Sequence, residues 1–293
     1  MGTGRAAGLA MAAAGTVAFS AKAIIVKLAY RHGVDAITLI MYRMLFSLPL
    51  FVALAWWAGR GRPALTLRDW RVVGLLGFTG YYLASLLDFL GLQYITASLE
   101  RLILYLNPTL VLLISVLAFK RRVAPRQWAA LALSYTGVLL VFAREVRLEG
   151  ASTALGAALV LGGAISYAVY LVVSGEEVRR LGALRLTGLA SSVACVLCLA
   201  QFALMRPLSA AAVAEPVIWL SLLNAVACTF LPVILVMMAI ERIGATLAAQ
   251  TGMIGPVATV AMGAIFLGER ITGWVVAGTA LVLAGVTWMA RAR

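Results

Sequence analysis

Ten long apolar stretches limit the fold of this 293-residue chain more than any other feature of its sequence. Each is long enough to cross the roughly 30 Å hydrocarbon core of a bilayer as an α-helix, which rises about 1.5 Å per residue. A helix also satisfies its own backbone polar groups, as a lipid environment requires. The stretches lie near residues 7–27, 37–58, 72–93, 97–119, 124–142, 154–173, 186–205, 217–239, 245–267 and 272–290.

Composition supports an all-α integral membrane protein with ten transmembrane helices. Charged residues make up 12% of the chain, well below the ~25% of a soluble domain, and no gap between the stretches could hold such a domain. The net charge of +13 would suggest nucleic acid in a soluble protein. In a chain this apolar it reports membrane topology, so we expect a lipid bilayer and no nucleic acid as partner. The three cysteines lie in apolar stretches without further metal ligands, so neither a disulfide framework, a metal nor a cofactor is expected.

The lysines and arginines divide unequally between the two sides of such a bundle. With the N-terminus inside, 15 of the 24 lie on the inner side, 6 on the outer side and 3 within spans. The outer six are Lys27, Arg31, Arg144, Arg147, Arg206 and Arg270. Because cytoplasmic loops carry the excess of positive charge, both termini are predicted to be cytoplasmic.

Shifting the sequence by 148 residues aligns its second half with its first. From residue 94 to 140, ten of the 47 aligned pairs are identical, where about four would be expected by chance. Pro108 falls on Pro256, and Arg122 falls on Arg270. The chain therefore contains an internal repeat.

An odd number of spans per half inverts the second copy in the membrane. We predict two inverted five-helix repeats, residues 1–143 and 154–293, joined by a short outer linker at 144–153. Inverted repeats are typical of secondary transporters, whose binding site lies near the midplane between the halves.

Short motifs recur along nearly the whole chain. They are Ala245-Thr246-Leu247-Ala248-Ala249, Gly255-Pro256, Leu267-Gly268-Glu269-Arg270 and Gly285-Val286 in the second half, and Val26-Lys27, Tyr42-Arg43 and Leu106-Asn107-Pro108 in the first. With these motifs the chain resembles the EamA branch of the drug/metabolite transporter superfamily, which consists of ten-helix carriers. One departure is Phe119-Lys120-Arg121-Arg122, which replaces the Gly-Glu-Arg ending usual in the fourth span.

The resemblance implies an activity and a location. Carriers of this branch export metabolites, including amino acids, by alternating access. The chain looks most similar to bacterial exporters of aromatic and other hydrophobic amino acids. A multi-pass protein of the bacterial inner membrane is therefore expected, with a small metabolite as its substrate.

Five ionisable residues lie within the spans of the first half: Lys22, Arg43, Asp88, Glu100 and Arg101. Helical rise places all five roughly 5 to 10 Å below the outer surface, in one charged layer with a net charge of +1. Charges at membrane depth face the bundle interior or water. The layer is interpreted as a site for a substrate carboxylate or as an outer gate. The alternative is a structural ion-pair network, with Lys22 and Arg101 extending outward to the surface.

Polar and aromatic side chains at helical spacing extend this candidate site. On the third span Phe78, Tyr82, Ser85 and Phe89 are predicted to share one face. The amides of Asn224 and Gln250 would be unsatisfied if they faced lipid. The predicted substrate-binding residues, in a cavity with aromatic walls, are Lys22, Arg43, Tyr82, Ser85, Asp88, Tyr105, Tyr167, Tyr170, Asn224 and Gln250. For each of them, ordinary helix packing is the alternative.

Two prolines occupy equivalent positions in the predicted fourth and ninth spans. Pro108 and Pro256 each remove a backbone hydrogen bond and clash with the carbonyl four residues earlier, which kinks or breaks a helix. Freed carbonyls at membrane depth are tolerated where they line a cavity. A hinge in each half is predicted, although a single proline in a membrane helix is unremarkable.

These observations favour a secondary transporter that exports amino acids or similar small metabolites. No catalytic constellation and no Walker motif can be assembled from the sequence, so neither an enzyme nor an ATP-driven pump is expected. A multidrug exporter remains an alternative, and a membrane-embedded enzyme or lipid-handling protein is an alternative of another class. Small-residue spacings such as Gly273-x-x-x-Ala277 allow packing within or between chains, so a homo-oligomer stays open.

Overall fold

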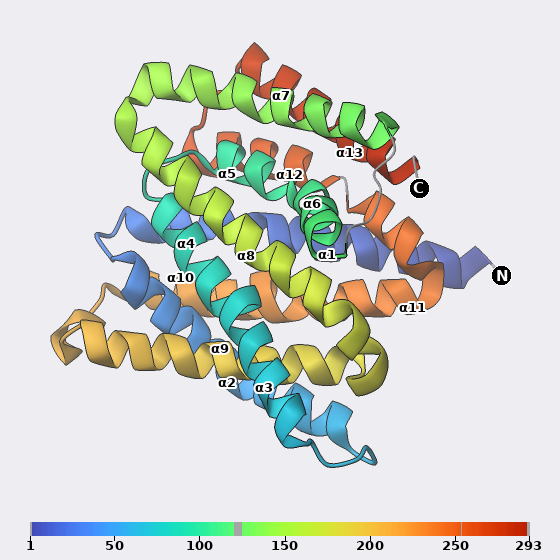
Figure 1. The fold of residues 1–293 in the computed structure, drawn as a ribbon. Helices are drawn as coiled ribbons and strands as arrows, with labels where there is room; N and C mark the ends of the chain where they lie inside the picture. Colours follow the sequence, from blue (N-terminus) through green and yellow to red (C-terminus); the bar gives the residue numbers. More distant parts are fainter. Residues whose placement is uncertain (1, 120–124, 253, 292–293) are drawn as a thin grey trace.

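Helices build the whole described part of the protein, which in this computed structural model comprises residues 2–119, 125–252 and 254–291 (Figure 1). Within these residues, eight helical segments are long and apolar enough to span a membrane: Ala6–Tyr30, Ala36–Gly59, Leu67–Gly91, Ala97–Ile114, Trp128–Arg147, Ala151–Ser174, Ala183–Met205 and Glu215–Val236. Two shorter apolar helical segments, Ile254–Leu267 and Gly273–Trp288, lie at the predicted ninth and tenth spans. The all-helical membrane class is confirmed, and the count of ten crossings stays a prediction.

The first half of the chain is divided into eight elements. They are α1 (Gly2–Tyr30), α2 (Ala36–Gly59), α3 (Leu67–Leu76), the π-helical segment η1 (Gly77–Leu83), α4 (Ala84–Gly91), α5 (Ala97–Leu104), α6 (Asn107–Phe119) and α7 (Pro125–Glu149). Side-chain caps begin three of these helices, at Asp35 for α2, Thr66 for α3 and Thr96 for α5. Each cap accepts a hydrogen bond from an amide that the helix itself leaves unpaired.

The second half follows the first almost without a connection. Its elements are α8 (Ala151–Leu181), α9 (Ala183–Met205), η2 (Leu208–Ala211), α10 (Glu215–Ala225), the π-helical η3 (Val226–Phe230), α11 (Leu231–Thr251), α12 (Ile254–Met262), the π-helical η4 (Gly263–Leu267) and α13 (Gly273–Arg291). Only Gly150 separates α7 from α8, and its φ of 85° is one that glycine adopts without strain. Most of the predicted linker 144–153 is therefore helical.

Irregular backbone recurs near the spacing of the sequence repeat. Moved by 148 residues, η1 covers residues 225–231, and η3 spans Val226–Phe230. Helix breaks also recur near this spacing. In the first half α5 ends at Leu104 before α6, and in the second half α11 ends at Thr251 before α12. The two breaks directly precede the two helices that contain Pro108 and Pro256. The kink or break expected from the prolines is thus present at both positions.

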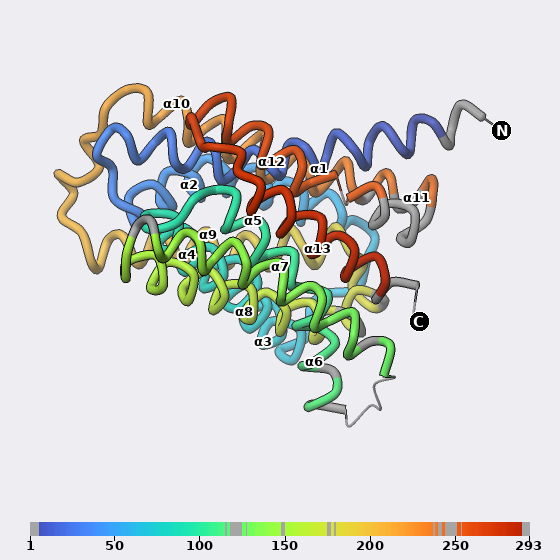
Figure 2. The backbone as a smooth tube through the Cα atoms, turned by 90° about the horizontal axis from the view of Figure 1, so that it is seen from above, coloured from blue at the N-terminus to red at the C-terminus, as the bar shows by residue number. Residues whose placement is uncertain are grey.

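Helices of the two halves pair reciprocally. In the described part, α2 packs against α9, α7 against α13, α1 against α11 and α4 against α8. Figures 1 and 2 show α1 lying along α11, with the two ends of the chain on the same side of the bundle. Glycines let the α7 and α13 backbones approach closely, since a Cβ on Gly137 would lie 2.6 Å from the Gly278 carbonyl oxygen. Buried apolar side chains of α1, α2, α4 and α9 form one core cluster.

Candidate functional site

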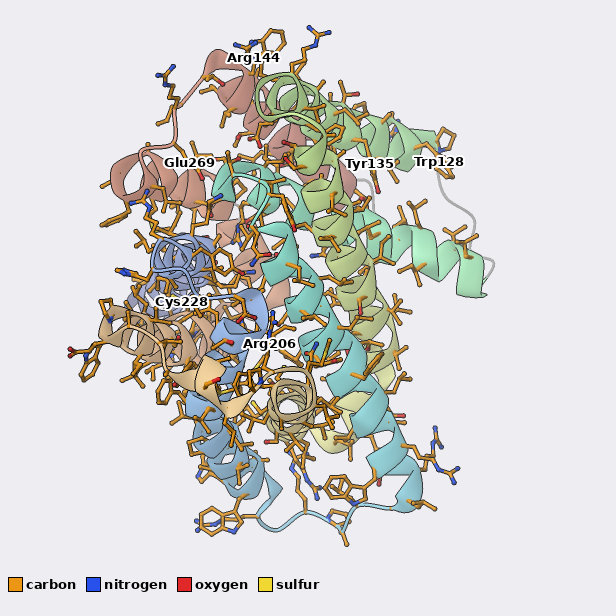
Figure 3. All side chains as sticks on the ribbon, turned by 90° about the vertical axis from the view of Figure 1, so that its left-hand side faces the viewer. Trp128, Tyr135, Arg144, Arg206, Cys228 and Glu269 are labelled. Atoms are coloured by element: carbon orange, nitrogen blue, oxygen red, sulfur yellow. The ribbon has the colours of Figure 1, made fainter. Side chains whose placement is uncertain are left out.

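A cavity of about 290 Å³, which we call the central cavity, lies between the two halves. Its walls come from α1, α2, η1, α4, α5, α6, α8, η3 and α11, so helices from both halves enclose it. Cys228, labelled in Figure 3, marks its η3 side. The lining residues are Phe19, Lys22, Arg43, Phe51, Gly80, Tyr81, Ala84, Ser85, Asp88, Arg101, Leu104, Tyr105, Asn107, Gly163, Tyr167, Cys228, Thr229 and Val233.

Lys22 holds both carboxylates of the charged layer. Its Nζ lies 2.5 Å from Asp88 Oδ2 and 3.1 Å from Glu100 Oε1, and all three side chains are at most 8% exposed. Asp88 lines the cavity and leaves its Oδ1 without a hydrogen-bond partner. Arg43 therefore does not serve as the ion-pair partner of Asp88.

Two buried guanidinium groups face the cavity without a carboxylate partner. Arg43 Nη2 donates to Ser85 Oγ at 2.8 Å, and its guanidinium lies 4.7 Å from the centre of the Phe89 ring. Arg101 Nη2 donates to Ser20 Oγ at 2.9 Å. Among the described residues no carboxylate lies within 4 Å of either group, and the Nε of each is buried and unpaired. The excess positive charge of the layer therefore sits on these two arginines.

The structure brings all five residues of the charged layer together and orients them inward. Lys22 and Arg101 are only 7% and 6% exposed, and their partners lie inside the bundle. The ion pairs of Lys22 form the network that the alternative interpretation expects, but neither Lys22 nor Arg101 extends outward to the membrane surface.

Aromatic rings form part of the cavity wall, and the Tyr105 ring lies 5.2 Å from the Arg101 guanidinium. Tyr167 and Tyr81 line the cavity, and Tyr170 packs behind them with ring centres 5.4 and 5.2 Å away. Tyr105 also lines it and donates its hydroxyl hydrogen to the Gly252 carbonyl, next to the break between α11 and α12. Asn107 Oδ1, at the start of α6, is buried without a partner. The wall therefore combines aromatic surface with a few unpaired polar atoms.

Tyr82 does not line the cavity, contrary to the sequence prediction, and Tyr81 takes its place. The predicted face of the third span assumed 3.6 residues per turn throughout. The π-helical segment η1 winds more residues into each turn, which rotates the side chains that follow. Tyr82 consequently lies beside Phe78, with the rings tilted and their centres 5.5 Å apart, whereas Ser85 still reaches the cavity.

Asn224 and the two predicted hinge prolines lie outside the cavity wall. Asn224 is buried on α10, and its Oδ1 has no partner, but it does not line the cavity. The side chain of Gln250 lies outside the described residues. Pro256 is buried in the first turn of α12, and Pro108 is exposed in the first turn of α6. Both prolines border the breaks without contacting the cavity.

Phe19, Tyr81, Asn107 and Thr229 line the cavity and were not predicted as substrate-binding residues. Asn107 stood in a recognised motif, immediately before Pro108, and that position was the one available signal. Phe19 and Thr229 look like ordinary residues of apolar spans, so nothing in the sequence distinguishes them.

Glu269 fixes the N-terminal end of α5. Its carboxylate accepts hydrogen bonds from the Ala97 amide at 2.7 Å and from the Ser98 hydroxyl at 2.8 Å. The carboxylate therefore caps the N-terminus of a helix in the other half, where the helix dipole favours negative charge. This contact gives the Gly-Glu-Arg motif of the second half a structural role, since the capped helix carries Glu100 and Arg101.

A bundle of membrane-spanning helices around a buried, charged and aromatic cavity defines a membrane transport protein. The model of the EamA-like transporter family matches residues 6–143 and 154–291, and the chain belongs to this family. It is 31% identical to "Uncharacterized transporter YcbK" of Bacillus subtilis (strain 168) over 91% of this chain and 87% of that protein. A second relative, "Uncharacterized transporter" of Archaeoglobus fulgidus, is 27% identical over 58% of each chain.

A solved structure described as "Crystal structure of protein" shares the fold. It aligns with a TM-score of 0.66 over 96% of this chain and 97% of that one, at 16% identity. At this identity the likeness establishes the fold alone. The family and the relatives agree on a multi-pass membrane transporter.

Proposed function

We propose that this protein exports amino acids or similar zwitterionic metabolites across the bacterial inner membrane by alternating access, with the central cavity as its binding site. One observation carries the proposal. Arg43 and Arg101 present buried guanidinium groups to the cavity, and both carboxylates of the layer are held by Lys22. A substrate carboxylate would supply the missing negative charge.

The other polar atoms suit the rest of an amino acid. Asp88 Oδ1 is buried, unpaired and in the cavity wall, so it offers an acceptor to a substrate ammonium. Tyr81 and Tyr167 offer aromatic surface to an apolar side chain. A volume of about 290 Å³ is at the lower end of the ~300–1,000 Å³ range of ligand pockets, which suits a small solute. The excess of cations opposes the export of cationic drugs.

Several features support two inverted repeats that alternate around the cavity. The family model matches each half separately, helices pair reciprocally between the halves, and the π-helical segments η1 and η3 and the two helix breaks lie near the repeat spacing. Such halves exchange access by rocking around a fixed central site. The cytoplasmic placement of both termini, taken from the distribution of cations, belongs to the same proposal.

Arg43→Gln tests the carboxylate contact. Binding of phenylalanine to the purified protein should weaken tenfold or more relative to binding of phenylalaninamide, because a charge-assisted hydrogen bond contributes about 1.5–3 kcal/mol. Arg71→Gln, at an exposed arginine outside the cavity, is the matched control. Because Asp88 keeps Lys22 as its partner, the change should leave thermal stability nearly intact. If Arg43→Gln left the ratio of the phenylalanine affinity to the phenylalaninamide affinity unchanged, the cavity would not be the site that binds the substrate carboxylate.

A further inference from the structure

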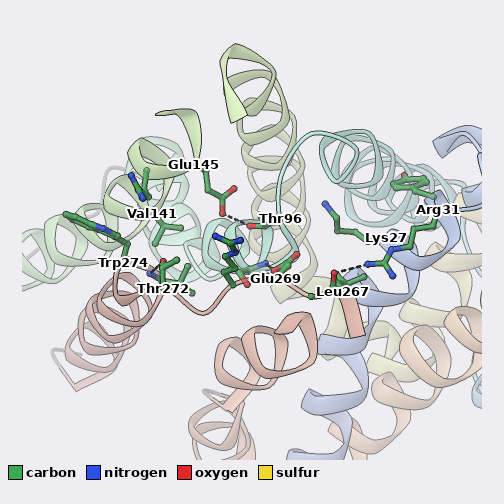
Figure 4. A pocket seen from close by; sticks show the side chains of 15 residues that line it. Lys27, Arg31, Thr96, Val141, Glu145, Leu267, Glu269, Thr272 and Trp274 are labelled. Carbon is green, nitrogen blue, oxygen red and sulfur yellow. Dashed lines mark hydrogen bonds between the residues drawn. The ribbon is translucent and has the colours of Figure 1, made fainter. Parts of the chain in front are cut away.

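A second cavity, of about 590 Å³, opens at the end of the bundle that the predicted topology places outside (Figure 4). It lies between the ends of α1, α5 and α7 and the segment that leads from η4 into α13. We call it the vestibule and define it by its charged lining: Lys27, Arg31, Arg144, Arg270, Glu145 and Glu269.

Four of the six cations predicted on the outer side gather in this one cavity. The concentration is unexpected, because outer loops of membrane proteins carry few lysines and arginines. Arg206, a fifth outer cation, is paired with Asp35 at 3.1 Å on another part of the surface. The lining of the vestibule bears a net charge of +2.

The two carboxylates of the vestibule are engaged by neighbouring polar groups. Glu269 caps α5, and Glu145 accepts a hydrogen bond from the Thr96 hydroxyl, which Figure 4 shows as a dashed line. In the described part of the chain, neither Arg144 nor Arg270 has a carboxylate within 4 Å. Two guanidinium groups thus remain available to an anion in an open cavity.

The vestibule and the central cavity lie about one turn apart along α5. Ser98, in the first turn of α5, lines the vestibule, and Arg101, one turn deeper, lines the central cavity. An anion leaving Arg101 would therefore meet the next unpaired cations at Arg144 and Arg270. Trp274, half-exposed in the vestibule wall, adds apolar surface beside them.

From this arrangement we infer that the vestibule is a second binding site, which takes the carboxylate of a small organic solute at the outer end of its path. The identity of the solute rests on the proposed function, but the site itself does not. The same anionic chemistry is present in lipid headgroups, so the test separates the two sources.

The charge of the vestibule can be measured at a cysteine placed in its wall. In Trp274→Cys protein in phosphatidylcholine nanodiscs, the anionic reagent 2-sulfonatoethyl methanethiosulfonate should react faster than its trimethylammonium analogue. The native cysteines are all buried. At low ionic strength, Arg144→Gln or Arg270→Gln should lower the ratio of the two rates by about fivefold, as expected for one charge roughly 8 Å away. Arg147→Gln removes an outer cation that does not line the vestibule and should change the ratio little.

Protection then identifies the anion. Phenylalanine should slow labelling of Cys at position 274, and phenylalaninamide should not. Protection by phosphatidylglycerol in the nanodisc, with none from phenylalanine, would assign the site to lipid and overturn the inference. A rate ratio that neither arginine changes would also overturn it. If Trp274→Cys fails to fold, Thr272→Cys reports from the same wall.

Arg43→Gln separates this inference from the proposed function. That change affects only the central cavity, so the rate ratio at position 274 should stay as in the parent. Absence of protection in the vestibule, together with an acid-to-amide ratio that still depends on Arg43, would refute the vestibule site and leave the proposed function standing.

Discussion

Asp88 and Glu100 share one partner, Lys22, but only Asp88 lines the central cavity. This difference makes the two carboxylates a matched pair for experiment. Asp88→Asn and Glu100→Gln each remove one negative charge from beside Lys22, and each leaves Lys22 with one carboxylate partner.

Asp88→Asn should weaken binding of phenylalanine tenfold or more, because its ammonium loses a charge-assisted contact of about 1.5–3 kcal/mol. Binding of 3-phenylpropionate, which lacks an ammonium, should be unchanged or tighter. Glu100→Gln should reduce thermal stability without separating the two ligands, since a buried lysine loses one of its pairs. Calorimetric titration of both ligands into both variants measures the difference. Equal weakening of both ligands by Asp88→Asn would contradict an ammonium site.

At the scale of residues, the sequence predicts the composition of the site better than its contacts. Burial of charge at membrane depth is costly, so Lys22, Arg43 and Asp88 could be recognised as interior without any structure. Their pairing depends on how α1, α2 and α4 are rotated about their axes, which residue spacing does not determine. The exchange of Tyr82 for Tyr81 has the same origin, because a π-helical segment has no sequence signature as clear as a proline.

At the scale of elements, helix ends join the two halves. Glu269, between η4 and α13, caps α5, and Arg31, after α1, donates to the Leu267 carbonyl at 2.8 Å. On the deeper side of α5, Tyr105 donates to the Gly252 carbonyl. The helix that carries Glu100 and Arg101 is thus held to the second half at both of its ends.

Glu269→Ala should lower the apparent melting temperature in detergent, because loss of a helix cap costs about 0.5–2 kcal/mol. Glu269→Gln should cost less, since its side-chain oxygen can still accept from the Ala97 amide. Glu215→Ala is the control, at an exposed glutamate in the first turn of α10. A melting temperature that falls equally in all three variants would show that the contact with α5 is of no special importance.

Asp35 gives the N-terminus of α2 a dependence on pH. Partial burial raises the pKa of this carboxyl, but hydrogen bonds from Thr38 and the nearby Arg206 outweigh burial and hold the pKa below its usual value. A group with a depressed pKa stabilises the fold above its unfolded pKa, here about 3.9, and loses that contribution as the pH falls through the folded pKa. The melting-temperature difference between parent and Asp35→Asn should therefore be present at pH 6 and shrink toward pH 3. Asparagine still caps a helix, so the difference reports the charge. A difference independent of pH would contradict this account.

At the scale of the whole molecule, hydropathy defines the positions of the helices and only partly their continuity. The predicted stretch 97–119 is divided between α5 and α6, and the linker 144–153 is almost entirely helix. The division follows from Pro108, whose effect on helices was foreseen. The sequence does not predict that the linker is helical. Its charged residues near 144–149 are typical of a loop, but they continue α7 beyond the apolar stretch.

The breaks of the two halves lie against each other. Tyr105, at the first break, bonds to Gly252, whose carbonyl lies four residues before Pro256. A proline cannot donate to that carbonyl, which accepts instead from the Gly255 amide at 3.0 Å and from the Tyr105 hydroxyl. Each break therefore helps to shape the other, and both border helices that enclose the central cavity.

Pro108→Ala and Pro256→Ala should each leave the protein folded but slow transport, and the double change should be slower still. Alanine restores an amide that can bond to the carbonyl four residues earlier, Leu104 or Gly252, which favours a continuous helix and one access state over the other. In the second case the new amide also competes with the Tyr105 hydroxyl. Initial rates of phenylalanine movement in proteoliposomes measure the effect. Pro49→Ala, at an exposed proline inside the unbroken helix α2, is the control for proline removal as such. Parent-like rates in both variants would make the breaks structural and move the search for the moving element to η1 and η3, the other irregular segments that border the cavity.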